Sequence, residues 1–265
     1  ASLAFYDQDR VRQLRAVEAL AERFPKDVNQ QLVRLSLLRE LGRRADYLQR
    51  LEALCEESDS LPIYWRMLAT EWIEDQRRLP EAERWVQRIL REQQSAEDLR
   101  LASRYYWRTN QRDLAVQVLR LAALSERLDE SLAADYFSLA RANGETEAGL
   151  EFLRQRHETL GRQSVGPTYN YVAALEACDQ HARADEALNE SLAWRPQDGE
   201  VMLSAAQFYM GWGRGAEAKQ MLAAAESITN RTRWLNTAAR FAMIFEDIAT
   251  QETLSREALQ LQPLN

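Results

Sequence analysis

The stretch GEVMLSAAQFYMGWGRGAEAKQMLAAAESITN, residues 199–230, decides the fold of this chain. In its second half Ala218 is followed four positions later by Leu222, which places a small and a large side chain one turn apart on the same helical face. A second helix can approach closely at the small residue. The same pairing recurs at spacings of 33, 33, 36 and 34 residues, in Ala82 with Val86, Ala115 with Leu119, Ala148 with Phe152, Ala184 with Leu188, and Ala218 with Leu222. A period of about 34 residues is typical of a helical solenoid whose units stack on one another.

Turn residues divide each repeat into two helices. The turn inside a pair is marked by residues that tolerate the left-handed backbone conformation at a helix end, at Gly42, Asn110, Gly144, Asp179 and Gly213. Capping residues or prolines mark the turns between pairs, among them Ser95, Asp129 and Pro196. We therefore expect an opening helix over residues 9–24 and helix pairs over 29–57, 62–93, 96–127, 130–161, 167–194, 199–228 and 231–261.

The composition agrees with an almost entirely helical chain, because glycine and proline number only 9 and 6. The net charge of -7 repels phosphate backbones, so we expect no nucleic-acid partner. The longest uncharged stretches, 163–175 and 201–213, are too short to cross a bilayer as a helix, and no transmembrane segment is expected. We expect a soluble protein of a bacterial cytoplasm or periplasm, since the scarce cysteines fit either compartment.

A solenoid has no separate cores and grows one unit at a time, so we expect a single domain over residues 1–265. The last predicted helix has no obvious polar cap, because Leu254, Ala258 and Leu261 continue the apolar stripe and Pro263 resembles the first step into another unit. We expect this chain to be a segment of a longer array, or to stack on a partner.

The repeats resemble the tetratricopeptide repeat (TPR) family. In residues 199–230 the resemblance rests on Ala206 and Tyr209 in the first helix, Gly213 in the turn, and Ala218 and Leu222 in the second helix. The family's first-helix tryptophan position is occupied by other residues, namely Arg66, Leu99, Leu132, Thr168, Met202 and Leu235. The resemblance implies an all-α, right-handed superhelical solenoid of about seven antiparallel helix pairs.

In the TPR family the first helices line a concave face that contacts ligands. This resemblance implies a partner-binding face formed by Tyr64, Met67, Glu71, Arg100, Arg104, Trp107, Phe137, Tyr169, Gln207, Asn236 and Arg240. The function that it implies is a non-enzymatic interaction scaffold, which holds an extended protein segment or a partner domain.

Arg100, Arg104 and Arg108 lie four residues apart and form a basic helical stripe beside Trp107. Such a stripe can bind a carboxylate, an acidic peptide or an anionic polysaccharide. Alternatively, these arginines pair with acidic residues of the preceding unit, because opposite charges on neighbouring helices usually form solvated ion pairs. The acidic candidates are Glu71, Glu74 and Asp75.

Little in the sequence supports catalysis. His157 and His181 are the only histidines, and neither lies at a metal-ligand spacing from a cysteine or another histidine. The glycine-rich stretch 211–215 is better interpreted as a hairpin turn than as a phosphate loop. We therefore expect no enzyme activity, cofactor or metal. A second hypothesis is a docking or regulatory arm of a large bacterial enzyme or polysaccharide-export protein, which binds a catalytic partner or an anionic glycan.

Overall fold

The computed structural model describes residues 2–57, 60–92, 94–245 and 248–261, with side chains from residue 9 onward. These residues form fifteen α-helices and one 3-10 helix but no β-strand, and 83% of the chain is helical. The chain is therefore all-α, as the sequence predicts. None of the helices in the described ranges is both long and apolar enough to span a membrane. The predicted role of Pro263 lies outside the described residues.

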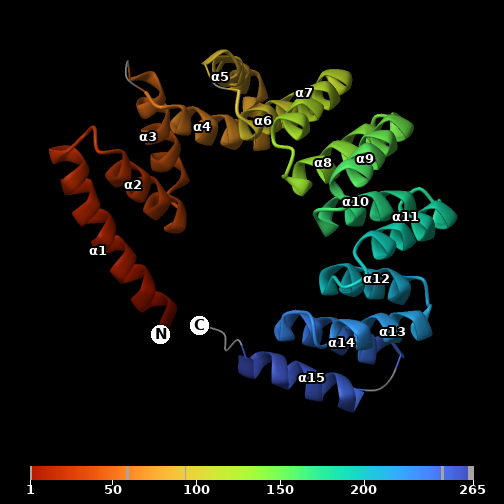
Figure 1. The fold of residues 1–265 in the computed structure, drawn as a ribbon. Helices are drawn as coiled ribbons and strands as arrows, with labels where there is room; N and C mark the ends of the chain where they lie inside the picture. The colour runs from red at the N-terminus through yellow and green to blue at the C-terminus, as the bar shows by residue number, and fades with distance from the viewer. Residues whose placement is uncertain (1, 58–59, 93, 246–247, 262–265) are drawn as a thin grey trace. The chain divides into compact units, whose positions relative to one another are not determined.

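The helices follow one another as antiparallel pairs. The opening helix α1 (Ser2–Arg23) begins before the predicted residue 9, because neither glycine nor proline interrupts residues 2–23. The pair boundaries agree with the predicted ranges to within three residues. The pairs (Figure 1) are α2 (Val28–Glu40) with α3 (Arg44–Glu56), α4 (Pro62–Glu74) with α5 (Leu79–Glu92), α6 (Ala96–Arg108) with α7 (Arg112–Ser125), α8 (Glu130–Ala142) with α9 (Thr146–Leu160), α10 (Val165–Glu176) with α11 (His181–Trp194), α12 (Gly199–Gly211) with α13 (Gly215–Ala225), and α14 (Arg231–Phe245) with α15 (Ile248–Leu261).

Packing divides the helices into two compact units, residues 1–126 and 127–265, whereas the sequence predicts one continuous domain. In the first unit, α4 contacts both its own partner α5 and the next first helix, α6. In the second unit the first helices α8, α10, α12 and α14 contact one another in that order. The first helices of the second unit, and α4 and α6 of the first unit, thus lie side by side. The handedness of a superhelix stays a prediction.

The five predicted turn residues all have a positive φ, between 56° at Asp179 and 86° at Gly144. At each turn the amide of the residue that follows the positive-φ residue donates to a carbonyl near the end of the first helix, as when Arg214 N donates to Tyr209 O at 2.8 Å. The pair α4–α5 is joined differently, by a 3-10 helix over Gln76–Arg78. A repeated left-handed turn therefore makes five of the pairs antiparallel.

The small residues of the repeat lie where the helices of a pair approach closely. Ala82, Ala115, Ala184 and Ala218 are each 0% exposed. Ala148, by contrast, is exposed, and its neighbour Gly149 is buried against the ring of Phe137. A Cβ on Gly149 would lie 3.1 Å from Cδ2 of Phe137. The small position of this repeat is therefore Gly149, and the prediction of Ala148 was wrong by one residue.

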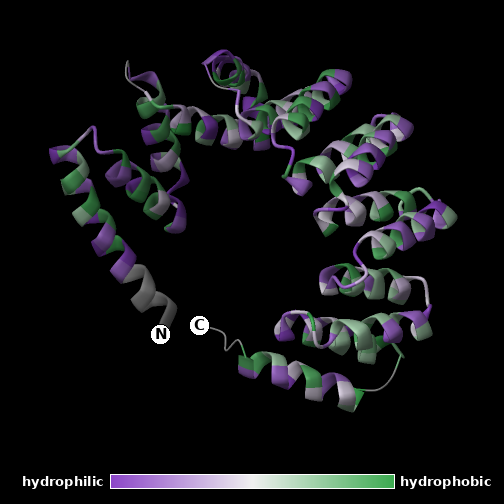
Figure 2. Ribbon diagram, viewed as in Figure 1, coloured by the Kyte–Doolittle hydropathy of each residue, from purple (hydrophilic) through white to green (hydrophobic). Residues whose placement is uncertain are grey.

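Large side chains fill the space beside these small positions. Trp65 and Trp85 are almost fully buried, and Tyr106 is buried as well. Figure 2 shows hydrophobic and hydrophilic residues mixed along each helix, as expected of helices with one buried and one exposed side. The core of each unit consequently runs between the two layers of helices.

Replacing a buried small residue by leucine should destabilise the second unit. Ala184→Leu forces three extra carbons into a closed contact, and we expect a loss of about 1–3 kcal/mol in the free energy of unfolding. Ala148→Leu, on the exposed side of α9, should change it by less than about 0.5 kcal/mol. Urea unfolding followed by circular dichroism measures both. Equal losses for the two variants would show that these positions do not differ in packing.

Candidate functional site

The first helices of the second unit line a groove of about 430 Å³. Because α8, α10, α12 and α14 lie side by side, residues one repeat apart come together along this groove. Its lining residues are Glu130 from α8, Val165, Gly166, Tyr169 and Asn170 from α10, Glu200, Leu203, Ser204 and Gln207 from α12, and Arg233, Asn236 and Thr237 from α14.

The middle of the groove offers an aromatic and apolar surface. The Tyr169 side chain is 42% exposed, and its ring centroid lies 5.1 Å from that of Phe208. Phe208 in turn lies 6.1 Å from Trp212, and Leu203 is buried beneath the groove. Tyr169 therefore presents a supported ring to whatever enters the groove.

Two carboxamides line the groove beside this ring. Gln207 is half-buried on α12, and Asn236 is exposed on α14. Within the described ranges neither side chain has a hydrogen-bond partner. A carboxamide both donates and accepts hydrogen bonds, as a peptide group does. The two side chains can therefore pair with the main chain of an extended segment.

Glu130 at one side of the groove is held from two other helices. Arg156 on α9 donates to the Glu130 carboxylate and, at 2.9 Å, to Arg127 O. Asn170 on α10 donates to Oε2 of Glu130 at 3.0 Å and to its carbonyl oxygen at 2.8 Å. The Glu130 side chain fits here because residue 166 is glycine: a Cβ at that position would lie 2.7 Å from Cγ of Glu130. This wall of the groove is thus fixed before any ligand binds.

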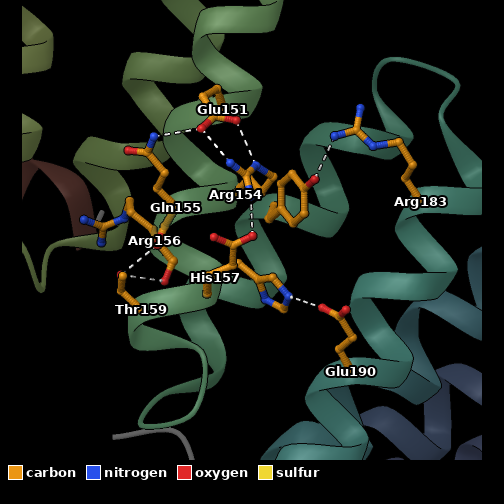
Figure 3. A network of polar contacts seen from close by, with 10 residues as sticks. Glu151, Arg154, Gln155, Arg156, His157, Thr159, Arg183 and Glu190 are labelled. Carbon is orange, nitrogen blue, oxygen red and sulfur yellow. Dashed lines mark hydrogen bonds and ion pairs between the residues drawn. The ribbon is translucent and has the colours of Figure 1, made fainter.

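A buried histidine fixes the helices behind the same wall (Figure 3). His157 on α9 has Nδ1 3.0 Å from Oγ1 of Thr168 on α10. Its Nε2 lies 3.1 Å from Oε2 of Glu190 on α11, as Figure 3 shows. Its ring stacks on Tyr171 at 5.5 Å and on Trp194 at 4.8 Å. His157 therefore ties three consecutive helices together, and its role here is structural. No group of histidine, cysteine, aspartate or glutamate side chains in the described ranges is arranged to hold a metal ion.

Three of the five predicted binding residues of the second unit, Tyr169, Gln207 and Asn236, line the groove together. Arg240 is exposed on α14 but is not among the lining residues. Phe137 is 7% exposed and is not available to a ligand. Its ring packs on Gly149, so this prediction is corrected: Phe137 belongs to the contact between α8 and α9.

In the first unit most of the predicted binding residues already have partners. Tyr64 was predicted to bind a partner, but it is only 5% exposed and belongs to the core. Met67 is half-buried. Glu71 pairs with Arg44 at 3.3 Å. The ring of Trp107 lies 5.2 Å from the guanidinium carbon of Arg112.

The arginine stripe of the first unit forms ion pairs with the preceding repeat. Arg104 and Arg108 on α6 both pair with Glu74 on α4, the second at 3.2 Å. Arg100 is half-buried on the same helix. The alternative that these arginines pair with neighbouring acids is confirmed for Arg104 and Arg108.

Sequence reasoning missed Glu130, Asn170 and Arg233. Arg233 pairs with Glu200 at 2.6 Å, and these two residues are one repeat apart in the sequence. Residues one repeat apart are neighbours in the stack, so opposite charges at that spacing could have predicted this ion pair from the sequence. For Glu130 the sequence offers no such signal, since its placement depends on Arg156 of another helix.

Arg66, at the position where the TPR family has tryptophan, is partly exposed and forms an ion pair with the buried Asp98. Its Nε donates to Oδ1 of Asp98 at 2.5 Å and its Nη2 to Oδ2 at 3.0 Å, which joins α4 to α6. Asp98 also caps its own helix with Ser95. Burial raises the pKa of the Asp98 carboxyl, but the hydrogen bonds from Arg66 and Ser95 outweigh burial and lower the pKa below its usual value.

No model of a known protein family matches the sequence, and no curated protein matches it either. Solved structures are similar in fold. A tetratricopeptide repeat protein from Parabacteroides merdae is 12% identical over 95% of this chain and 94% of its own, with a TM-score of 0.48. The C-terminal part of a TPR protein from Cytophaga hutchinsonii is 13% identical over 87% and 95%, with a TM-score of 0.45. PilF of Pseudomonas aeruginosa is 17% identical over 77% and 93%, with a TM-score of 0.40.

The chain has a TPR-like helical fold, in which antiparallel helix pairs repeat about every 34 residues and stack within each unit. The TM-scores of these three structures are below 0.5, so none of the three places a binding residue on this chain. The groove is a candidate binding site because of the side chains that line it.

Asp98→Asn should destabilise the first unit by about 1–3 kcal/mol at neutral pH, because it removes the charge that Arg66 pairs with. The folded pKa of Asp98 is lowered, so the stabilisation is present above its ordinary pKa and is lost as the pH falls through the folded pKa. The difference between wild type and variant should therefore shrink in acid. Urea unfolding at a series of pH values measures it.

Glu52→Gln serves as a control for this prediction. Glu52 pairs with Arg78 at 2.8 Å, and both side chains are exposed. Removing such a surface pair should cost at most about 1 kcal/mol. The role given to the Arg66–Asp98 pair would be contradicted if Asp98→Asn lowered the free energy of unfolding by no more than Glu52→Gln does. It would also be contradicted if the loss for Asp98→Asn stayed the same as the pH was lowered into the acid range.

Proposed function

We propose that this chain is a non-enzymatic interaction scaffold and that the groove of the second unit binds an extended segment of a protein partner. One observation carries the proposal. The exposed ring of Tyr169 and the carboxamides of Gln207 and Asn236 face one groove of about 430 Å³, and within the described residues these carboxamides have no hydrogen-bond partner.

The chemistry of the groove suits a peptide. An extended segment presents amide donors and carbonyl acceptors along its length, which a carboxamide can satisfy in either sense. An apolar side chain of that segment can pack on the Tyr169 ring over Leu203, where the buried area supplies most of the affinity. The ion pair between Glu200 and Arg233 borders the groove and favours one register of a charged ligand.

The groove is also built in advance. The bonds from Arg156 and Asn170 to Glu130, and those of His157, fix α8, α9 and α10 without a ligand. A receptor that is already ordered spends little entropy on binding. The arginine stripe of the first unit supports binding less well, because Glu74 already pairs with Arg104 and Arg108. The anionic-glycan alternative stays a hypothesis, and these ion pairs favour the peptide groove over it.

The double variant Tyr169→Ala, Asn236→Ala should lose peptide binding. Peptides of roughly 12 residues, long enough to span several helices, would be selected from a displayed random library against the whole chain and measured by fluorescence anisotropy. We expect affinity to fall about tenfold or more in the double variant, since an aromatic anchor and a main-chain contact are both removed. Circular dichroism would show that the variant is folded.

The matched control is Arg104→Ala with Trp107→Ala, which changes the arginine stripe in the first unit. Its affinity for the same peptides should equal that of the wild type. If instead the peptides lose affinity only with this control, the stripe is the binding site and the groove is not. A library that yields no saturable binder would oppose the peptide-binding proposal itself.

A further inference from the structure

A second cavity lies in the first unit, away from the first helices that were predicted to bind a partner. It has a volume of about 320 Å³ and lies where α1, α2 and α3 meet. In Figure 1, α1 and α3 flank α2. The residues that line it are Glu18, Arg34, Leu38, Arg43, Asp46, Gln49, Arg50 and Ala53.

Three arginines face this cavity, and their N–H groups are mostly unused. Arg34 makes no hydrogen bond within the described residues, and its nearest acid, Glu18, lies 3.8 Å from its Nη2. Arg43 donates one bond, from Nε to Asp46 at 2.7 Å. Arg50 donates one bond, from Nε to Oε1 of Gln31 at 3.2 Å, and its Nη2 lies 3.9 Å from Oε1 of Glu57. Three guanidinium groups therefore share a cavity with two carboxylates, and most of their donors remain open.

The Nε of Arg34 is a buried donor without a partner. A buried donor that stays unpaired costs free energy, whereas a paired one of a charged group stabilises. The two Nη groups of Arg34 are not buried in this way, since the side chain is 23% exposed, and they are the donors that an acceptor entering the cavity can reach.

The guanidinium group determines which ligand fits. Its parallel N–H groups match the two oxygens of a carboxylate or of a phosphate and favour planar, bidentate contacts. Arg43 stands at the N-cap of α3, where the helix dipole adds positive potential. The volume is at the lower end of the range for small-molecule sites.

We propose that this cavity binds the carboxylate or phosphate group of a small anionic ligand, with Arg34 as its main donor and Arg43 and Arg50 beside it. Glu18 competes with that ligand for Arg34. The site lies in the first unit and shares no residue with the peptide groove of the second unit, so either proposal can fail without the other.

The test follows the arginine Nε–Hε resonances of the whole chain by NMR during titration with inorganic phosphate or with succinate, at an ionic strength held constant with sodium chloride. We expect saturable shifts of the Arg34 resonance in the millimolar range with at least one of the two anions. The anion that saturates identifies the group that the cavity takes. If neither anion gives a saturable shift, the proposal is overturned.

Matched variants separate a built site from general electrostatic attraction. Arg34→Gln should weaken binding about tenfold or more, read from the Arg43 and Arg50 resonances. Arg91→Gln removes the same charge from an exposed position on α5 and should leave the affinity unchanged. Glu18→Gln removes the competing carboxylate and should tighten binding severalfold, a gain that unfolding cannot imitate. Equal affinities of the Arg34 and Arg91 variants, or no gain from Glu18→Gln, would overturn the assignment.

Discussion

The rest of the structure depends on the close approach of two helices at one small residue, which occurs in five of the seven helix pairs. Ala82, Ala115, Gly149, Ala184 and Ala218 occupy this position, and the large residues beside them fill the space that it leaves. Because the helices of a pair touch there, a left-handed turn such as Gly213 suffices to reverse the chain. Pairs of one shape then stack, and their first helices come to lie side by side. The groove of the second unit is a consequence of this packing and needs no special loop.

Electrostatics adds a second tie between neighbouring repeats, and it helps to tell structure from function. Arg66 with Asp98, Arg104 with Glu74, and Arg233 with Glu200 each join a first helix to the next one. Arg104, which was predicted to bind a ligand, is paired in this way. The functional candidates are instead side chains with hydrogen-bonding groups that remain unused, such as Gln207 and Asn236 in one unit and Arg34 in the other. In a stack of this kind, unused hydrogen-bonding capacity is a better guide to function than charge.

The sequence was sufficient for the helix pairs and their turns, because the period and the turn residues are local signals. Gly149 was missed because an alanine stands beside it and glycine can serve as the small residue equally well. Position in the repeat located Tyr169, Gln207 and Asn236 correctly on the lining of the groove, but it could not separate them from Phe137, whose ring turns toward the core. Glu130 and the cavity beside Arg34 depend on side chains from three helices, and no spacing along the chain predicts such a meeting.

The two carboxamides of the groove have a consequence for selectivity. Contacts to the main chain are the same for every sequence, so Gln207 and Asn236 would hold an extended segment without identifying it. Discrimination would then fall on the single residue that packs against Tyr169 and on any charge that meets Glu200 and Arg233. A groove of this type accepts a class of segments defined by one anchor, and evolution could exchange the partner by altering a few side chains while the stack of helices stays the same.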